Sequence, residues 1–206
     1  MGLAGWVAGP APALALAARM KVVTILGDSI TAGLGLPANQ ALPAQLQRAL
    51  AQLGVSAVVR GAGVSGDTAA DGLARLDFSV GADTDVCVVA LGGNDLLQGA
   101  SPAATEASLA AIVRRLKARR IGVVLAGVAA PPAVGAGYAR AFAAIFPAIA
   151  RAEQVSVLPD LLAGVGPSVR QADGLHPSAA GVTLIANRLA PLVARALKAR
   201  SRGTRK

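Results

Sequence analysis

The sequence has very little of what builds a disulfide framework, a zinc site or a nucleic-acid stacking surface. Its 206 residues include one cysteine, Cys87, and one histidine, His176, which excludes an intrachain disulfide and a Cys/His zinc cluster. Cys87 lies inside an apolar run, so we expect a buried, unreactive thiol. Aromatic residues make up 2% of the chain, too few for the stacking platforms that bind single-stranded nucleic acid. We therefore expect no nucleic-acid partner.

Long apolar runs are also missing. Hydrophobic residues make up 54% of the chain, but no uninterrupted run reaches the roughly 18 residues of a membrane span, so we predict no stable membrane insertion. The net charge of +9 is concentrated in two stretches, 114–120 and 198–206, each with five positive charges. Such stretches are typical of the exposed end of a helix and of a solvated tail; the alternative is weak attraction to anionic lipid surfaces or nucleic acid.

The first 20 residues allow two interpretations. They end in small residues, as a secretory signal does, but they have no Lys or Arg in the first 18 positions and are interrupted by glycine and proline. We interpret residues 1–20 as a disordered extension or a weak signal-like segment. The protein is expected to be periplasmic or secreted if they are a signal, and cytoplasmic otherwise. Residues 21–198 are predicted to form one domain, and residues 199–206 a basic tail.

Strands and helices alternate along the rest of the chain. Apolar, β-branched runs predict five strands, at 22–26, 55–60, 85–91, 121–126 and 155–158. Helical spacing predicts helices at 42–53, 67–76, 102–119, 138–153 and 178–198. Ser101 is the expected N-cap of the third helix, and Pro191 the expected kink of the last. Connections of this length are crossovers between parallel strands, so the expected fold is α/β, a five-stranded parallel sheet with helices on both faces.

A distinctive polar group follows four of these strands. Ser29 comes after the first strand, Gly66 after the second and Asn94 after the third, and the segment after the fifth contains Asp173 and His176. The carboxyl ends of parallel strands gather at one edge of the sheet, where open α/β sheets bind their ligands. We therefore expect these five residues to lie together.

Their residue types are those of nucleophilic catalysis. A serine hydroxyl is a poor nucleophile unless a base takes its proton. His176 can be this base, and Asp173, three residues earlier, can accept the imidazole Nδ1–H and leave Nε2 facing Ser29. We predict a catalytic triad of these three residues, with activity that rises from mildly acidic to alkaline pH.

An oxyanion hole and an acyl pocket are predicted beside the triad. The donors are the backbone N–H groups of Ser29 and Gly66 and the side-chain amide of Asn94, with Gly66 leaving room for an acyl oxygen because it has no Cβ. Three apolar segments rich in Gly and Pro are predicted to line the pocket: 31–41, 128–137 and 160–172.

Other polar features are assigned to structure. Asp28, Asp67 and Asp95 are expected to bond loop backbone amides, and we predict neither a metal nor a cofactor. Segment 61–66 reads G-x-G-x-x-G after a strand, as a dinucleotide-binding loop does. That loop needs an acid at the end of the next strand, whereas the nearby carboxylates precede the third strand, so we reject this interpretation.

Four sequence blocks carry a family resemblance: Gly27-Asp-Ser-Ile30, Gly63-Val-Ser-Gly-Asp-Thr68, Gly92-Gly-Asn-Asp95 and Asp173-Gly-Leu-His-Pro177. With these blocks in this order, the chain resembles the SGNH (GDSL) hydrolase family over about residues 21–195. The segment Gly72-Leu-Ala-Arg-Leu76 resembles the bacterial branch of acyl-CoA thioesterases, lysophospholipases and arylesterases. The resemblance implies a flavodoxin-like three-layer α/β/α sandwich and a hydrolase that needs no cofactor.

The expected function is that of a serine esterase or thioesterase acting on small-molecule aryl esters, acyl-CoA thioesters or lysophospholipids through an acyl-enzyme. One alternative is a carbohydrate O-acetyl esterase with the same fold. A second is a non-catalytic binding module, which would be expected to have lost at least one of the site residues. All are present: Ser29, Asn94, Asp173 and His176.

Overall fold

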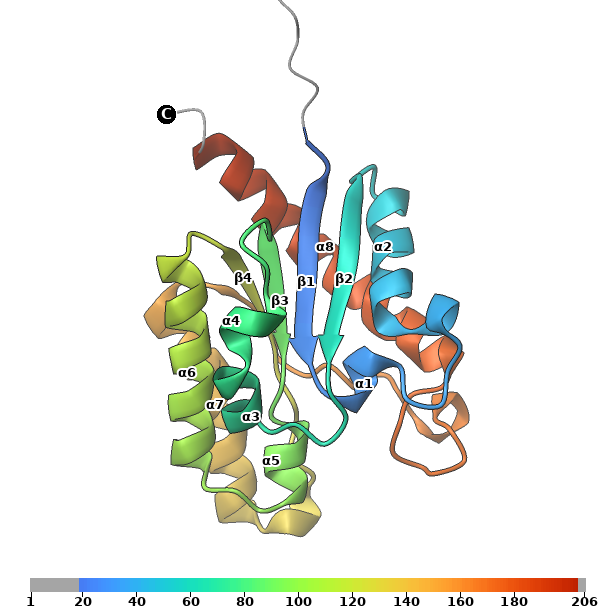
Figure 1. The fold of residues 1–206 in the computed structure, drawn as a ribbon. Coiled ribbons are helices and arrows are strands. Elements are labelled where there is room, and N and C mark those ends of the chain that lie inside the picture. Colours follow the sequence, from blue (N-terminus) through green and yellow to red (C-terminus); the bar gives the residue numbers. More distant parts are fainter. Residues whose placement is uncertain (1–18, 204–206) are drawn as a thin grey trace, which may run out of the picture.

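Five parallel strands form the sheet in this computed structural model, which describes residues 19–203. The strands lie in the order β2-β1-β3-β4-β5, which is the order of flavodoxin-like folds (Figure 1). The expected α/β fold with five parallel strands is confirmed. Our interpretations of residues 1–18 and 204–206 fall outside the described residues. The strands are β1 (Lys21–Gly27), β2 (Ala57–Gly63), β3 (Val86–Ala90), β4 (Gly122–Ala126) and β5 (Ser156–Leu158).

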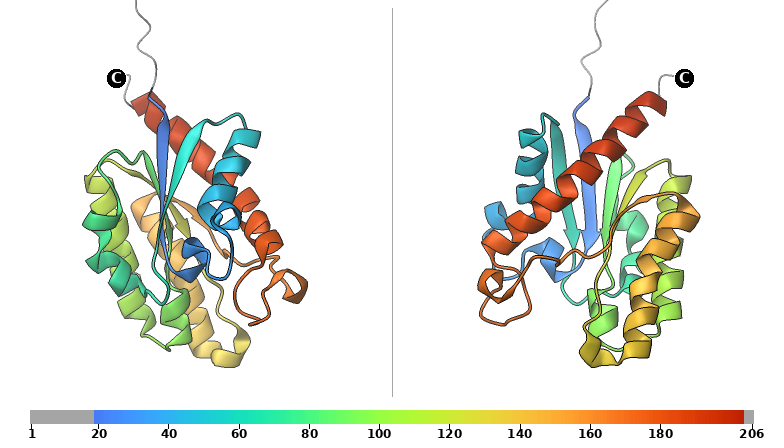
Figure 2. Two further views of the ribbon diagram at one scale, coloured as in Figure 1. Left: turned by 45° about the vertical axis from the view of Figure 1, so that its right-hand side comes forward. Right: turned by 180° about the vertical axis from the view of Figure 1, so that it is seen from behind.

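Helices cover both faces of the sheet and complete three layers (Figures 1 and 2). One face carries α2 (Leu42–Gln52) and α8 (Ala179–Gly203). The other face carries α3 (Ala69–Ala74), α4 (Leu76–Ser79), α6 (Pro102–Ala118) and α7 (Ala136–Glu153). The connections after the strands contain the short helices α1 (Ser29–Ala32) and α5 (Gly93–Leu97) and the 3-10 turns η1 (Ala38–Gln40), η2 (Pro132–Val134) and η3 (Pro167–Val169).

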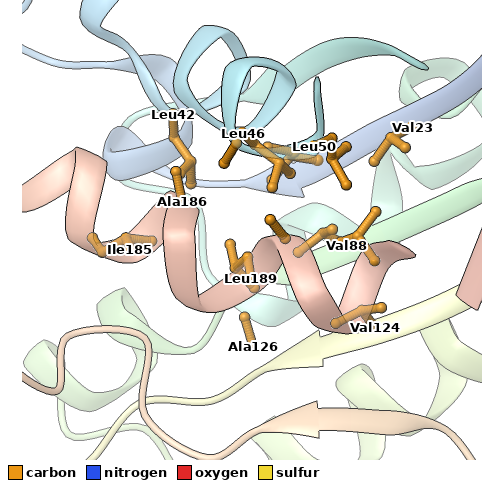
Figure 3. Close-up of a cluster of buried hydrophobic side chains, with 14 of the residues drawn as sticks. Val23, Leu42, Leu46, Leu50, Val88, Val124, Ala126, Ile185, Ala186 and Leu189 are labelled. Atoms are coloured by element: carbon orange, nitrogen blue, oxygen red, sulfur yellow. The ribbon is translucent and has the colours of Figure 1, made fainter. Parts of the chain in front are cut away.

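The strand side chains divide between two hydrophobic clusters. In β1, Val23 and Ile25 belong to the cluster under α2 and α8, whereas Leu26 belongs to the cluster under α6 and α7. This alternation follows from the two-residue period of a strand, and burial on both faces explains why the strands read as continuous apolar runs. Figure 3 shows Leu50 of α2 and Leu189 of α8 in the first cluster. Both are completely buried, and truncating such a leucine to alanine costs about 2–5 kcal/mol.

The second strand starts and ends later than its side-chain pattern predicted. It covers 57–63 rather than 55–60, and it pairs with β1 along its whole length, from Lys21 opposite Ala57 to Gly27 opposite Gly63. Backbone hydrogen bonds continue the ladder through glycines that have no side chain to signal a strand. The predicted boundary was therefore wrong by three residues at the carboxyl end.

Two helix predictions need correction. The helix predicted over 67–76 is two helices, α3 and α4, and Arg75 is the C-cap of the first and the N-cap of the second. Ser101 occupies the predicted N-cap position of α6, with Pro102 as the first helical residue, but the Ser101 side chain makes no capping hydrogen bond.

The last helix is longer than expected. It contains Pro191 and continues to Gly203, into the stretch that we expected to be a basic tail. Its segment Ala179–Arg200 is long and apolar enough to cross a membrane by length and composition, with a mean hydropathy of 1.2. Half of that segment is buried inside the fold, where α8 packs against α2 and strands β3 to β5, and a core helix passes the same test.

Candidate active site

Ser29 is the first residue of α1, two residues after the end of β1. Asp28 caps this helix, because its Oδ1 accepts the Ile30 N–H at 3.0 Å, and Gly33 ends it in the left-handed conformation at φ 78°. The first N–H groups of a helix have no acceptor within it. The backbone N–H of Ser29 is therefore available to a ligand at the carboxyl edge of the sheet.

Asp28 is itself buried, with 6% of its surface exposed. Burial raises the pKa of the Asp28 carboxyl above its ordinary value, and the hydrogen bond from Ile30 opposes this shift. This local bond matches the structural role expected for Asp28.

Ser29 and His176 are in contact although 147 residues separate them. Ser29 Oγ lies 2.9 Å from His176 Nε2, and His176 Nδ1 lies 2.6 Å from Asp173 Oδ2. The other oxygen of Asp173 accepts the backbone N–H groups of Leu175 at 2.9 Å and His176 at 3.0 Å. The structure thus brings the three predicted triad side chains together in the predicted order.

The protonation states follow from the Asp173 carboxylate. Its hydrogen bond with His176, together with the N–H groups of Leu175 and His176, lowers the pKa of Asp173 to about 2. An ionised carboxylate can only accept, so in neutral His176 the proton stays on Nδ1 and Nε2 is left to accept the Ser29 hydroxyl.

The loop that carries Asp173 and His176 is fastened from within. Arg170 donates from Nη1 to the carbonyl of Gly174 at 3.0 Å and from Nε to that of Val165 at 3.1 Å. The Gln171 N–H donates to the carbonyl of His176 at 2.8 Å. These bonds hold the imidazole at the edge of the site without a long secondary-structure element.

Gly66 and Asn94, the other two predicted oxyanion-hole residues, lie in the connections that follow β2 and β3. Gly66 has a φ of +90°, and a Cβ added to it would meet nothing within 4 Å. The backbone conformation, rather than crowding by the protein, is therefore what requires glycine here. Asn94, in α5, donates from Nδ2 to the carbonyl of Asp67 at 2.8 Å. A primary amide has two N–H groups, and the second is available to a ligand.

Ser29, Gly66, Asn94 and His176 border a cavity of about 490 Å³. Each of the three segments expected to line it contributes apolar residues, among them Leu34, Val128 and Leu162. The contribution of α5 through Leu97 was not predicted, because a five-residue helix has too few residues to show a period. The apolar lining residues are Ile30, Leu34, Leu96, Leu97, Val128, Ala129, Pro131, Leu162 and Leu175.

The carboxylates near the site make specific protein contacts. Asp95 accepts the Ala69 N–H at 2.8 Å and the Thr105 hydroxyl at 3.0 Å, as a structural role requires. Asp67 differs from our expectation, because its side chain accepts from Arg75 Nε at 2.5 Å rather than from a loop amide. Within residues 19–200, no three His, Cys, Asp or Glu side chains gather as metal ligands would.

The first two glycines of the G-x-G-x-x-G segment, Gly61 and Gly63, allow close packing. A Cβ on Gly61 would lie 2.8 Å from the Pro43 side chain, and one on Gly63 would lie 2.4 Å from the backbone nitrogen of Ala32 in α1. Gly61 therefore leaves room for the start of α2, and Gly63 lets the helix that carries Ser29 pack against the end of β2.

Residues 25–184 match the GDSL-like Lipase/Acylhydrolase family. The chain belongs to this family. The resemblance drawn from the four sequence blocks is thereby confirmed, and the protein is a hydrolase. The GDSL hydrolase shares 40% identity over 166 residues with esterase TesA of Pseudomonas aeruginosa, an overlap that covers 79% of this chain and 83% of that protein.

Other relatives extend the match across most of the fold. The thioesterase 1/protease 1/lysophospholipase L1 of Escherichia coli is 38% identical over 184 residues, which cover 86% of this chain and 87% of that protein. The crystal structure of TesA superposes with a TM-score of 0.80 at 36% identity, covering 85% of this chain and 99% of the other. AlinE4, an SGNH-hydrolase family esterase, gives a TM-score of 0.73 at 40% identity, covering 87% and 97% of the two chains.

Proposed function

We propose that this GDSL hydrolase cleaves carboxylic esters or thioesters of acyl chains, with Ser29 as nucleophile, His176 as general base and Asp173 as the partner that orients His176. The observation that carries the proposal is the unbroken row of hydrogen bonds, 2.9 Å from Ser29 to His176 and 2.6 Å from His176 to Asp173, at the border of an apolar cavity. A nucleophile, a base and an orienting group in hydrogen-bond contact are the signature of an activated serine.

The reaction has two halves. Ser29 Oγ attacks the acyl carbonyl carbon while its proton passes to Nε2 of His176, and the ionised Asp173 stabilises the imidazolium. His176 then returns the proton to the leaving alcohol or thiol as its bond to the acyl carbon breaks, which leaves the acyl group on Ser29. Water then attacks this ester while its proton passes to the same imidazole, and His176 returns the proton to Ser29 Oγ as the bond to the acyl carbon breaks and the carboxylic acid leaves.

The oxyanion of each tetrahedral intermediate needs hydrogen-bond donors that point toward it. In the proposal these are the backbone N–H groups of Ser29 and Gly66 and the second N–H of the Asn94 amide. All three residues border the cavity. Removal of a single donor of this kind costs about 2.7–4 kcal/mol of transition-state stabilisation.

The shape and lining of the cavity favour an acyl chain over an acetyl group. Leu34, Leu97 and Leu175 line it and still expose 42–64% of their surfaces, so apolar side chains continue from the interior to the mouth. Burying apolar substrate surface against such side chains is favourable by about 25 cal/mol per Å². A longer chain therefore gains binding energy that an acetyl ester lacks. The relatives named as esterases and as a thioesterase and lysophospholipase support the same class of substrate.

The test is a comparison of initial rates on p-nitrophenyl esters from acetyl to palmitoyl, for the wild-type protein and Ser29→Ala. We expect turnover by the wild type, an optimum beyond acetyl, and loss of turnover in Ser29→Ala. An optimum at acetyl together with release of acetate from acetylated sugars would identify a carbohydrate esterase instead. Equal rates in both proteins would remove Ser29 from the mechanism, and no turnover by either would point to a binding module.

A second variant tests the acyl cavity. Leu97→Ser removes apolar surface from the mouth and is expected to lower the ratio of kcat/KM for long over acetyl esters about fivefold, equivalent to roughly 1 kcal/mol of lost burial. Leu53→Ser is the matched control, because Leu53 is 51% exposed at the end of α2 and does not line the cavity. A chain-length profile of Leu97→Ser identical to that of Leu53→Ser would contradict this cavity assignment.

A further inference from the structure

Arg75 lies at the junction of α3 and α4, outside the residues that line the cavity. Its guanidinium group nevertheless bonds to the segments that carry the proposed oxyanion donors. Nε donates to Asp67 Oδ2 at 2.5 Å, Nη2 to the carbonyl of Gly27 at 2.8 Å, and Nη1 to the carbonyl of Ala62 at 3.0 Å. Nη1 also donates to the hydroxyl of Ser79 in α4 at 3.0 Å. One side chain therefore connects the ends of β1 and β2 with the loop between β2 and α3.

In the sequence, the acceptors of Arg75 lie close to the residues of the proposed oxyanion hole. Gly27 is two residues before Ser29, while Ala62 and Asp67 stand on either side of Gly66. Two of these acceptors are backbone carbonyls at the strand ends, so Arg75 fixes the points from which the donor segments leave the sheet. The guanidinium thus holds the two connections that present the proposed backbone donors.

Asn94 is attached to the same network. The backbone carbonyl of Asp67 accepts one N–H of the Asn94 amide at 2.8 Å, while the Asp67 side chain accepts from Arg75. The orientation of the Asn94 amide therefore depends on the position of a residue that Arg75 holds. The carbonyl of Gly27 is shared in the same way, since it also accepts the Val64 N–H at 3.1 Å.

The side chains of this network are largely buried, so water competes little for their hydrogen bonds. The side chains of Arg75 and Asp67 are 20% and 12% exposed. Charge-assisted bonds of this kind are shorter and stronger than neutral ones. Lysine would not replace this arrangement, because its donors diverge from a single nitrogen, whereas a guanidinium presents five donors in a rigid plane.

We infer that Arg75 is a positioning residue that aligns the oxyanion hole by holding the ends of β1 and β2 and the Gly66–Asp67 segment in register. The inference rests on the proposed function, because it requires that Ser29, Gly66 and Asn94 act on a developing oxyanion. Arg75 acts through these groups and does not touch the substrate. Its loss therefore lowers kcat and leaves KM nearly unchanged.

The test compares Arg75→Met and Arg75→Lys with the wild type in kcat and KM on one soluble ester, well below the melting temperature of each variant. Donors must lie within about 0.5 Å of their productive positions, and a displacement of about 1 Å costs roughly a hundredfold. We expect kcat to fall about ten- to a hundredfold in both variants, with KM within about twofold of the wild type. Arg60→Met is the matched control, because it breaks another Arg–Asp pair, with Asp83, whose side chains are 49% and 52% exposed.

A double-mutant comparison with Asn94→Ala separates positioning from general loosening of the fold. If Arg75 acts through the oxyanion donors, Arg75→Met costs less in the Asn94→Ala background than in the wild type. Full additivity of the two losses, a kcat of Arg75→Met equal to that of Arg60→Met, or a raised KM at normal kcat would each overturn the inference. If one of these three results is obtained while the wild type is active and Ser29→Ala is inactive, only the inference about Arg75 fails and the proposed function is retained. A wild type without turnover overturns both.

Discussion

Gly63→Ala adds one methyl group at the point where the helix that carries Ser29 packs on the sheet. A Cβ at this position would lie 2.4 Å from the Ala32 nitrogen and 2.7 Å from the Asp28 carbonyl oxygen. These two atoms form the 2.9 Å hydrogen bond that closes the first turn of α1. The methyl group would therefore be forced against the backbone of this turn, and backbone cannot rotate aside as a flexible side chain can.

The size of the required movement sets the expected effect. Ordinary Cβ contacts begin at 3.4 Å, so α1 and the end of β2 must separate by about 1 Å. A displacement of this size at a catalytic group costs roughly a hundredfold in rate. Overpacking of a well-packed site costs about 1–3 kcal/mol of folding free energy, and each kcal/mol lowers the melting temperature by about 2–4 °C in a domain of this size.

The assay is kcat on a soluble p-nitrophenyl ester, measured at a temperature where circular dichroism shows the variant to be folded. Gly137→Ala is the matched control. Gly137 lies in α7, and a Cβ there would meet nothing within 4 Å. A kcat of Gly63→Ala within twofold of the control would refute the argument, because it would show that the site tolerates the displacement or that the packing is looser than these distances require.

Three further predictions concern Asp173, Cys87 and Thr31. The pKa of Asp173 is lowered from 3.8 to about 2 in the folded protein, so its ionised form stabilises the fold above pH 3.8, and this contribution disappears as the pH falls through about 2. The melting temperature of Asp173→Asn should accordingly be lower than that of the wild type at neutral pH, and the two values should converge near pH 2. A difference that persists at pH 2 would contradict the lowered pKa of Asp173. Complete burial raises the pKa of the Cys87 thiol to about 12, so a disulfide reagent should modify it only after denaturation, and labelling of the native protein would count against its burial. The buried Thr31 hydroxyl has no hydrogen-bond partner among the described residues. Thr31→Val should therefore raise the free energy of unfolding by about 1 kcal/mol in a denaturant titration. A lower free energy of unfolding would indicate that this hydroxyl is hydrogen-bonded.

Local chemistry accounts for the part of the site that the sequence could predict. Asp173 and His176 are three residues apart, and a single carboxylate can accept both the imidazole and the backbone of the same turn, as the structure shows. Ser29 follows an apolar run that is buried on both faces, which is the pattern of a central parallel strand. The convergence of Ser29, Gly66 and Asn94 follows from the rule that parallel strands end at one edge of the sheet.

The predictions that failed or were not made depend on contacts between segments far apart in the chain. The end of β2 was misplaced because backbone pairing with β1, rather than side-chain pattern, continues the strand to Gly63. Arg75 was assigned to a predicted helix and to a segment that carries the family resemblance, but its contacts could not be predicted, because its acceptor Gly27 is 48 residues away. Leu97 could not be assigned to the cavity from a five-residue helix.

The sequence by itself determined the alternation of strands and helices, the residues that the strand ends would present, and the Asp173–His176 pair, because hydrophobic period, glycine conformation and short-range hydrogen bonds are properties of neighbouring residues. Only the tertiary structure decided which donors Arg75 would hold, how closely α1 would pack on Gly63 and which leucines would line the cavity. Those features arise where elements meet after folding. Their geometry is set by packing and by the pairing of buried polar groups, which no single segment of the sequence contains.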